Sequence, residues 1–563
     1  MAKPRIPKKE VTLRSPEDTE RLAMAAQIET ILGHAKYRLT LLGAFAFLLL
    51  GLLVTGAQNL HQLNSQGIAY LLLAKHYVAG DFGLAISSYW SPFLSWLIAA
   101  GLKMGWSDPT AARVATGASA LLFWMGSVAA LFMCQLPIRA LLCGAWLLSF
   151  AAIHWSVEYI GPDLLAGGLL LTAITLSLFT FRVRHRAANI IAGILWGSVY
   201  YANAMFLPAI VVCLIGFSIA GKLGTQENAK PWLPSILSQC VIALLTMAPW
   251  WATLSNTYGK PTLGSVWAID HAVAGPKDID RYHPCFGQFN PPSEGRITNW
   301  EDPARLDYAV WSPFANEDLK LHQNTLLKRN LKSIFQIFRE FASFGLGIAA
   351  LLACFFIRPP FKRSILSSTW RWSIFPIAGL VIAFLPFVVT PLDTRFFYSC
   401  YPLLMIACFG FLDWIPKQFE WPKFPHTFAT ALIAILFALP IIPRLASSLE
   451  GVPNPGGYVA LDLAERMETA QLSGTIAGDA LLMGSRTGLF IAALLNQKWI
   501  GDSPDVVGTD YISNGADLII VHRQHRVNSD MEFNPAFRDL DTVLFPDKMQ
   551  AEEFPLRVYQ VNR

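Results

Sequence analysis

The sequence predicts an α-helical polytopic membrane protein with a small α/β domain at its C-terminal end. Hydrophobic residues make up 53% of the 563 positions, charged residues make up only 15%, and the mean hydropathy is positive. A soluble globular chain of this length needs more polar surface than this composition supplies. The net charge of +5 is small and includes no long basic run away from the membrane, so no nucleic-acid partner is expected.

Apolar windows account for most of the chain between the two termini. Eleven of them are candidates to cross a hydrocarbon core of about 30 Å, although several are short. They lie at about 38–57, 109–133, 136–153, 163–181, 187–204, 206–220, 233–252, 341–357, 372–390, 397–414 and 426–445. Together they predict a bundle of about eleven spans, with additional helices along the membrane surface.

Cationic clusters stand at alternate ends of these windows. They are Arg182 to Arg186, Lys222 with Lys230, Arg358 to Arg363, and Lys417 with Lys423. The positive-inside rule places such clusters in the cytoplasm. We therefore expect a cytoplasmic segment over 1–37, a transmembrane domain over 38–447 with external loops at 58–108 and 253–340, and an extracytoplasmic domain over 448–563.

The first external loop contains an apolar piece, 91–104, that is too short for an ordinary span. This length predicts helices that lie along the membrane surface, with Tyr89, Trp90 and Trp96 as interfacial aromatics. An ordinary helical hairpin is the alternative. The surface-helix interpretation leaves Lys103 and Arg113 outside, against the charge rule, and is weakest at that point.

The C-terminal segment predicts a compact α/β layer. The stretches GTIAGD, KWIGD, ADLIIVHR and LRVYQVN are typical of short buried strands, and RTGLFIAALLNQ is typical of a helix between them. Gly474, Gly478 and Gly484 do not have the spacing of a dinucleotide-binding fingerprint, so no nucleotide cofactor is expected. The eight cysteines of the chain show neither a CxxC spacing nor a dense cluster, which argues against a disulfide framework or a zinc site.

Acidic residues beside span ends indicate the chemistry. Carboxylates at the membrane surface with an arginine facing them suit an enzyme that joins a lipid-borne phosphate sugar to an acceptor. The candidate acids are Asp163, Glu158 and Asp81, and the candidate arginine is Arg395. Each main candidate also has a structural alternative. Asp163 would cap a helix, worth about 1 kcal/mol, Glu158 would be a solvated loop acid, and Arg395 would pair with Asp393.

The order of several segments resembles a known class. The first external loop, HWSVEYIGPDLL around Asp163, GILWGSVYYANAMFLP and DTRFFY follow one another as in the polyprenyl-phosphate-dependent glycosyltransferases of the GT-C fold. That class includes protein O-mannosyltransferases and the lipid A aminoarabinose transferase. The similarity covers most of the membrane region and depends on order and topology rather than on one specific motif. It implies an acid in each of two external loops and basic groups for the lipid phosphate. Asp163 matches the second acid, and Arg395 matches the phosphate-facing arginine.

Two positions depart from the pattern of that class. Gln66 in NSQGIAY stands where relatives commonly have an aspartate, and an amide cannot accept a proton from the acceptor. Asn203 in YYANAMFLP stands where a lysine is often found, so one phosphate ligand has lost its charge. Either the site is reorganised around Asp81, Glu158 and Asp163, or activity is reduced or absent.

The resemblance implies transfer of a sugar from a polyprenyl-phosphate donor to a lipid, glycan or protein acceptor on the outer side of a bacterial inner membrane. No redox cofactor is implied, and although some members of the class use a divalent metal, no ligand cluster here demands one. A catalytically degenerate subunit with a binding or assembly role is the first alternative. A transporter is the second, but no internal repeat is visible. The expected substrate-binding residues are Arg395, Gln66, Lys75, His76, Tyr89, Trp90, His154 and Asn203.

Overall fold

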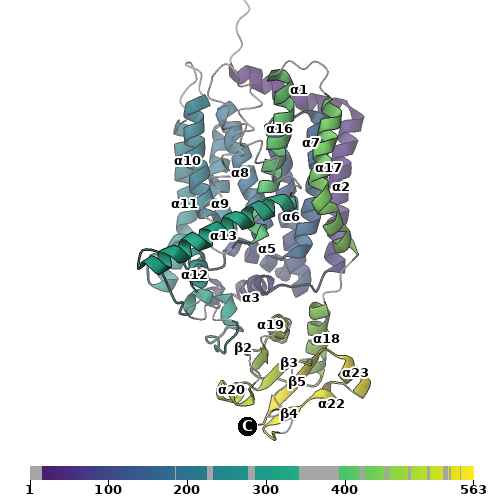
Figure 1. Ribbon diagram of the computed structural model, residues 1–563, viewed down its shortest axis with the longest axis vertical. Helices are drawn as coiled ribbons and strands as arrows, with labels where there is room; N and C mark the ends of the chain where they lie inside the picture. The colour runs from purple at the N-terminus through teal and green to yellow at the C-terminus, as the bar shows by residue number, and fades with distance from the viewer. Residues whose placement is uncertain are drawn as a thin grey trace, which may run out of the picture.

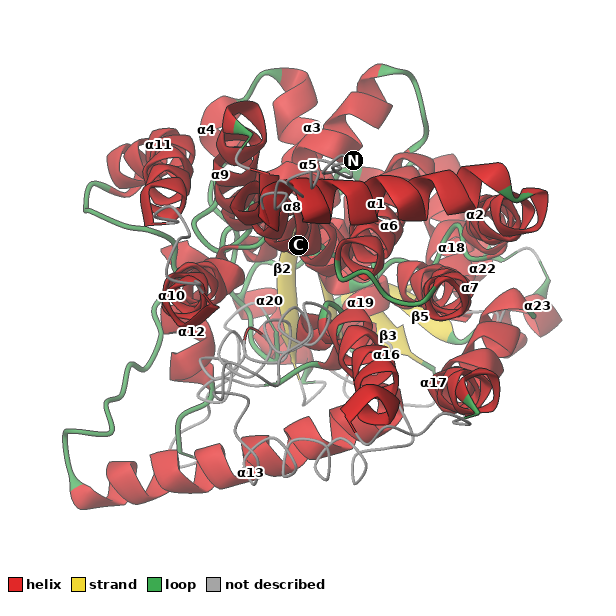
Figure 2. Ribbon diagram, turned by 90° about the horizontal axis from the view of Figure 1, so that it is seen from above, coloured by secondary structure: helices red, strands yellow, loops and turns green. Residues whose placement is uncertain are grey.

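A bundle of long, roughly parallel helices and a small α/β domain beyond one end of it make up the computed structural model (Figure 1). Helix α1 (Pro16–Gly33) lies across the opposite end of the bundle (Figures 1 and 2). The predicted cytoplasmic segment and the predicted extracytoplasmic domain are thus at opposite ends. The structure describes residues 16–183, 185–224, 233–276, 286–341, 379, 392–418, 425–450, 455–479, 484–503, 507–523, 531, 534–545 and 547–562.

Long apolar helices occupy most of the predicted windows. Within the described residues, seven helical segments are long and apolar enough to span a membrane. They are α2 (Ala35–Gln58), α6 (Asp108–Met133), α7 (Ile138–Glu158), α8 (Asp163–Val183), α11 (Leu233–Tyr258), α16 (Cys400–Gln418) with the turn before it, and α17 (His426–Leu449). Two further windows contain α9 (Arg186–Ala202), which has 17 residues, and α10 (Leu207–Gly224), whose apolar part is shorter. The windows 341–357 and 372–390 fall almost wholly outside the described residues, so the total of eleven stays a prediction.

Helices α6 and α8 approach each other closely because glycines stand where they meet. A Cβ atom at Gly126 would lie 2.7 Å from the carbonyl oxygen of Gly168, and one at Gly168 would lie 2.7 Å from the backbone nitrogen of Phe123. Small residues permit such close contact between membrane helices, and a larger side chain would separate them. Because α8 begins at Asp163, this contact sets the position of a candidate acid.

The predicted first external loop is built from α3 (Ser65–Ala79), α4 (Phe82–Ala85) and α5 (Pro92–Lys103). Helix α5 has 12 residues, too few for a span. Helices α3 and α5 lie at the end of the bundle that faces the C-terminal domain (Figure 1). The expected interfacial aromatics divide into two groups. Trp96 is 39% exposed, whereas Tyr89 and Trp90 are 8% and 5% exposed, so the interfacial interpretation was wrong for these two.

The second external loop contains α12 (Val266–Val273), the 3-10 turns η2 (Asn299–Glu301) and η3 (Pro303–Arg305), and α13 (Glu317–Phe341). Helix α13 runs across the flank of the bundle rather than along its axis (Figures 1 and 2). Apart from the 25-residue α13, the elements described in this loop have eight residues or fewer.

Arg113, the cation that conflicts with the charge rule, has a structural role. Its side chain is buried, and Nη1 donates to the carbonyl groups of Ser156 and Val157 at 3.2 Å each. Its Nη2 donates to the carbonyl group of Gln62. The guanidinium thus satisfies carbonyl groups in the last turn of α7 and joins α7 to the segment before α3. An arginine used in this way is not a surface charge and does not report on topology.

The C-terminal domain contains a five-stranded sheet with the strand order β2-β1-β3-β5-β4. Strand β1 (Ile476–Asp479) pairs in parallel with β2 (Trp499–Ser503) and β3 (Leu518–His522), and β5 (Leu556–Val561) pairs antiparallel with β3 and β4 (Phe537–Asp539). The four predicted strands and the predicted helix between them are present. Strand β4 has three residues, too few to form an apolar run in the sequence. The helices are α18 (Pro455–Thr469), α19 (Gly484–Leu495), α20 (Gly508–Ser513), α22 (Asp541–Leu544) and α23 (Lys548–Glu553).

The second external loop covers the edge of this sheet. The amide of Trp499 in β2 donates to the carbonyl group of Ile297 at 2.7 Å, and the amide of Asn290 donates to that of Ile500 at 2.6 Å. Strand β2 is the first strand of the sheet, so its free edge is protected by this pairing. The same loop continues into η2 at the end of the bundle, and the domain is thereby held against the membrane part.

The expected sidedness can be tested with single cysteines in a variant lacking the native ones. Gly83→Cys in α4 and Ala187→Cys in α9 both place the thiol at an exposed position. A membrane-impermeant maleimide added to intact spheroplasts should label Gly83→Cys, while Ala187→Cys should react only after permeabilisation. Tyr458→Cys in α18 should match Gly83→Cys, because its side chain is exposed and belongs to the same end of the molecule. The reverse labelling pattern would show that the protein has the opposite orientation in the membrane.

Candidate functional site

Three segments that are distant in the sequence place polar side chains next to one another at the end of the bundle near α3. Gln66 lies in the first turn of α3, and Asp163 is the first residue of α8. Arg395 belongs to the turn η5 (Thr394–Phe397), directly before α16. Both Asp163 and Arg395 were expected at span ends, and the fold brings the two together.

The guanidinium of Arg395 is the centre of this group. Its side chain is 7% exposed, Nη1 donates to Gln66 Oε1, and the same nitrogen lies 3.7 Å from Asp163 Oδ2. Nη2 donates to Asp393 Oδ2 at 2.7 Å, and the guanidinium lies 4.2 Å from the centroid of the Tyr159 ring. The expected pairing of Arg395 with Asp393 is therefore present, but it accompanies the contact with Asp163 rather than replacing it. Within the described residues, Arg395 Nε has no hydrogen-bond partner.

Gly161 leaves the space in which these side chains meet. A Cβ atom there would lie 3.2 Å from Asp163 Oδ2, 3.6 Å from Gln66 Oε1 and 3.8 Å from Arg395 Nη1. Any side chain would enter the point on which the three polar atoms converge. Gly161 was not among the predicted site residues, although the Gly-Pro pair directly before Asp163 was its signal in the sequence.

Asn203 also reaches the site. Its Nδ2 donates to Asp163 Oδ1 at 3.3 Å, and its Oδ1 accepts from the amide of Met205 at 3.0 Å. Asn203 ends α9 and begins the turn η1 (Ala204–Phe206), so the cap fixes its side chain. Both oxygens of Asp163 thus face polar partners, Asn203 on one side and Arg395 on the other.

Glu158 and His154 form a neighbouring group at the end of α7. Glu158 Oε2 accepts from the hydroxyl of Tyr398 at 3.3 Å and lies 3.6 Å from His154 Nε2. The Tyr398 ring stacks on Trp155 with centroids 4.2 Å apart. Tyr398 follows directly on the turn that carries Arg395, so it links the two groups. No direct polar contact between Glu158 and Arg395 occurs in the described part of the chain, and the Glu158 side chain is 43% exposed.

Lys75, His76 and Asp81 are not brought to Arg395. Lys75 Nζ lies 2.6 Å from Asp108 Oδ2 and donates to the carbonyl group of Ala493 in α19. Asp81 is exposed at the start of α4, and no contact given by the described residues joins it to the Arg395 group. Lys75 therefore attaches α3 to the C-terminal domain, and a catalytic role for Asp81 has no support from its position.

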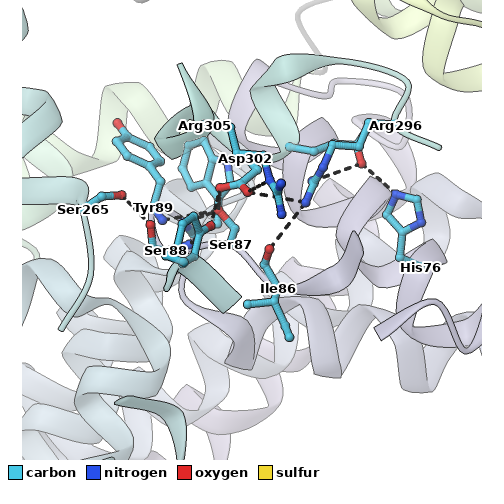
Figure 3. A network of polar contacts seen from close by, with 12 residues as sticks. His76, Ile86, Ser87, Ser88, Tyr89, Ser265, Arg296, Asp302 and Arg305 are labelled. Carbon is cyan, nitrogen blue, oxygen red and sulfur yellow. Dashed lines mark hydrogen bonds and ion pairs between the residues drawn. The ribbon is translucent and has the colours of Figure 1, made fainter. Parts of the chain in front are cut away.

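A second buried network lies between α3 and the second external loop (Figure 3). His76 Nε2 lies 2.7 Å from Glu301 Oε2, and Arg296 lies between Glu301, at 3.7 Å, and Asp302, at 3.5 Å. Asp302 also accepts from the Tyr258 hydroxyl at 2.7 Å and pairs with the Arg305 guanidinium at 2.8 Å. The acids are satisfied by several partners, which identifies the network as a structural connection. His76 has its partner here rather than at the predicted substrate site.

Buried aromatic side chains connect this loop to the first turn of α3. Trp300 Nε1 donates to the carbonyl group of Ser65, the residue before Gln66, at 3.0 Å. Trp90 Nε1 donates to the carbonyl group of Trp300 at 2.7 Å, and the two indoles meet edge to face. Trp90 thus has a structural partner, and Trp300 helps to fix the position of Gln66. Nothing in the local sequence pattern distinguished Trp300 from the other tryptophans.

Asp270 is a further acid that the sequence analysis did not select. Its Oδ1 accepts from the hydroxyl of Tyr89 at 2.9 Å, and the charge of Arg395 acts on its carboxyl group. Asp270 lies in α12, in a helix of eight residues, and its sequence signal was only an acid on an otherwise apolar turn. Tyr89, predicted as a substrate-binding residue, is its partner.

No group of three or more His, Cys, Asp and Glu side chains suitable for a metal ion occurs in the described residues. The acids of the site face Arg395, Asn203 and Tyr398 instead. The expectation that no cofactor is required stays a prediction.

Solved structures with a similar fold include ArnT from Cupriavidus metallidurans. The crystal structure of ArnT bound to undecaprenyl phosphate has 13% sequence identity to this chain and a TM-score of 0.50, and its apo structure has 13% identity and a TM-score of 0.51. In both, the match covers 92% of this chain and 97% of ArnT. The arabinofuranosyltransferase AftD from Mycobacteria matches over 92% of this chain and 40% of its own, at 14% identity and a TM-score of 0.47. No protein-family model matches the sequence, and no curated protein matches it. The likeness to ArnT confirms the expected GT-C fold.

Proposed function

We propose that this protein is a membrane glycosyltransferase that moves a sugar from a polyprenyl-phosphate donor to an acceptor at the end of the bundle occupied by α3. The GT-C fold supports the general class of reaction. The observation that carries the proposal is the buried contact of Arg395 with Asp163 and Gln66, which three separate segments contribute. A guanidinium held among acids at the end of a span is expensive to bury, and such groups are retained mainly for function.

Arg395 is the group that binds the donor phosphate in this proposal. Its Nε is buried without a hydrogen-bond partner in the described residues, so the guanidinium has one N–H donor available for a phosphate oxygen. Asp393 is the exchangeable partner, because its side chain is 35% exposed while that of Asp163 is 5% exposed. A phosphate oxygen would take the place of Asp393 at Nη2. Asp163 would remain beside Nη1 and keep the guanidinium oriented.

Asp163 orients the reacting groups. Its two oxygens are held by Asn203 and Arg395, and Gly161 keeps the adjoining space free of side chains. A carboxylate fixed in this way can align an acceptor hydroxyl with respect to the donor phosphate. Glu158, at the edge of the same group and partly exposed, would contact the acceptor beyond the reacting hydroxyl.

A catalytically degenerate subunit is the second candidate. The observation in its favour concerns position 66, where the resemblance implies an acid. Gln66 carries no charge there, and its Oε1 already accepts a hydrogen bond from Arg395. Asn203 likewise supplies an amide to Asp163 in place of a cation. Such a protein would bind the lipid phosphate without turning over.

Turnover by the purified full-length protein separates the two candidates. Reconstituted into vesicles with a panel of polyprenyl-phosphate sugars, the wild-type protein should release polyprenyl phosphate. Gln66→Asp should bind donor more weakly, because a third carboxylate would compete with the phosphate for Arg395. Gln58→Asp, at the exposed end of α2, is the matched control. An inactive parent that gains transfer through Gln66→Asp would instead establish the degenerate subunit.

A further inference from the structure

Helix α12 lies directly beside the site. The amide of Ser265 donates to the carbonyl group of Ser88 at 2.8 Å, and the two serine hydroxyls lie 2.9 Å apart (Figure 3). Gly264 has a φ of +125°, and a Cβ there would lie 3.7 Å from the Cβ of Ala204. Helix α12 also packs against η1, the turn that follows Asn203. Asn203 bonds Asp163, so α12 packs against the turn that follows one member of the site.

One polar side chain of α12 faces a buried tyrosine. Asp270 Oδ1 accepts a hydrogen bond from the Tyr89 hydroxyl at 2.9 Å. Burial, and next the neighbouring Asp270, raise the pKa of Tyr89 well above its ordinary value, so Tyr89 stays protonated and acts as the donor. Among the described residues, Tyr89 is the one hydrogen-bond donor to the Asp270 carboxylate. Oδ2 is therefore left for a proton from another molecule, in contrast to the two engaged oxygens of Asp163.

The charged and titratable groups around Asp270 come from several elements. Tyr89 faces it from the loop before α5, Arg395 acts on it from η5, and Tyr308 acts on Tyr89 from the loop after η3. His271, the next residue of α12, stacks on Trp311, and His322 of α13 lies 3.0 Å from the carbonyl group of Ala274. Burial raises the pKa of Asp270 to about 7, although the Tyr89 hydrogen bond and the charge of Arg395 lower it.

We propose that Asp270 is the general base of the transfer reaction and supplies the function that the amide at Gln66 cannot. This inference deepens the proposed function and rests on it. The acceptor O–H gives its proton to Asp270 Oδ2, and its oxygen forms a bond to the anomeric carbon of the sugar. The bond between that carbon and the phosphate oxygen breaks, and polyprenyl phosphate leaves with the electron pair. Asp270 then returns its proton to water. Tyr89 is a positioning residue that holds the carboxylate through Oδ1.

The test measures kcat and KM of the full-length protein in vesicles across the neutral pH range, with the polyprenyl-phosphate sugar that the wild-type protein accepts. A base must be deprotonated to act, so wild-type kcat/KM should fall below a pH of about 7. Asp270→Asn should lower kcat by a factor of about 10² to 10⁴ without raising KM for the donor. Tyr89→Phe should move the acid limb to higher pH, because the lost hydrogen bond had lowered the pKa of Asp270.

Asp307→Asn, an exposed acid of the same loop, is the control and should leave the profile unchanged. A wild-type protein that turns over while Asp270→Asn keeps its kcat would overturn the base assignment and leave the proposed function standing. A Tyr89→Phe profile that loses rate equally at every pH would mean that Tyr89 acts only through folding. A wild-type protein inactive with every donor would overturn both proposals.

Discussion

Asp163→Asn is expected to abolish measurable sugar transfer while the protein remains folded. The amide keeps the size of the carboxylate and can still accept the hydrogen bond of Asn203 through its oxygen, but it no longer attracts the Arg395 guanidinium. The loss of orientation of both the arginine and the acceptor should lower kcat/KM by a factor of about 10² or more. Turnover in vesicles, with thermal unfolding monitored in parallel, is the measurement.

The competing role of Asp163 is helix capping, and it predicts a different result. A first-turn acid stabilises a helix by about 1 kcal/mol, which would lower the melting temperature slightly and leave turnover intact. Asp81→Asn is the matched control, because Asp81 also stands at a helix start, as the N-cap of α4, but has no contact with Arg395 in the described residues. If Asp163→Asn transfers sugar at the rate of Asp81→Asn, its role in the reaction is excluded.

Arg395→Ala is expected to remove binding of polyprenyl phosphate. Hydrogen bonds to charged groups contribute about 1.5–3 kcal/mol, which corresponds to roughly a 10- to 150-fold increase in Kd for each bond lost. Arg395→Lys should also bind weakly, because a point charge cannot span Gln66, Asp163 and a phosphate as the planar fork does. Calorimetric titration of the protein in nanodiscs with polyprenyl phosphate gives the affinities.

A companion variant distinguishes phosphate binding from a purely structural arginine. Asp393→Asn weakens the carboxylate that the phosphate is proposed to displace, so it should bind polyprenyl phosphate more tightly than the wild-type protein. Arg444→Ala is the control, because Arg444 pairs with Glu340 at 3.2 Å and has no described contact with Arg395. Unchanged affinity in Arg395→Ala, or weaker binding in Asp393→Asn, would show that Arg395 does not bind the phosphate.

The contact of Gln66 with Arg395 explains what an amide at position 66 does in place of the expected aspartate. An aspartate there would add a third carboxylate around Arg395, besides Asp163 and Asp393. The amide accepts the guanidinium hydrogen bond without adding charge, which leaves the arginine more available to an anion. The substitution that argued against activity in the sequence is therefore compatible with donor binding, provided that another acid takes the proton. Asp270, whose Oδ1 is held by Tyr89, is the acid proposed for that role.

Apolar length and alternation were enough to predict much of the architecture. A run such as 109–133 can only be buried in lipid or in a bundle as a helix, and the short apolar stretches after residue 470 fit strands of a small sheet. The same reasoning placed Asp163 and Arg395 at span ends, because charged residues lie mostly near the ends of the long apolar runs. It also recognised α5 as too short to cross the membrane.

Which side chains meet was decided only by the tertiary structure. Gln66, Asp163 and Arg395 come from three segments, and Asp270 bonds Tyr89, a tyrosine that looked interfacial. Lys75 and His76 are side chains of the expected kind, yet their partners are Asp108 and Glu301 instead. Local periodicity determines how each segment folds and how deeply it is buried. The partner of a polar side chain depends on helix packing, as at Gly126 and Gly168, and on long-range contacts that no single segment encodes.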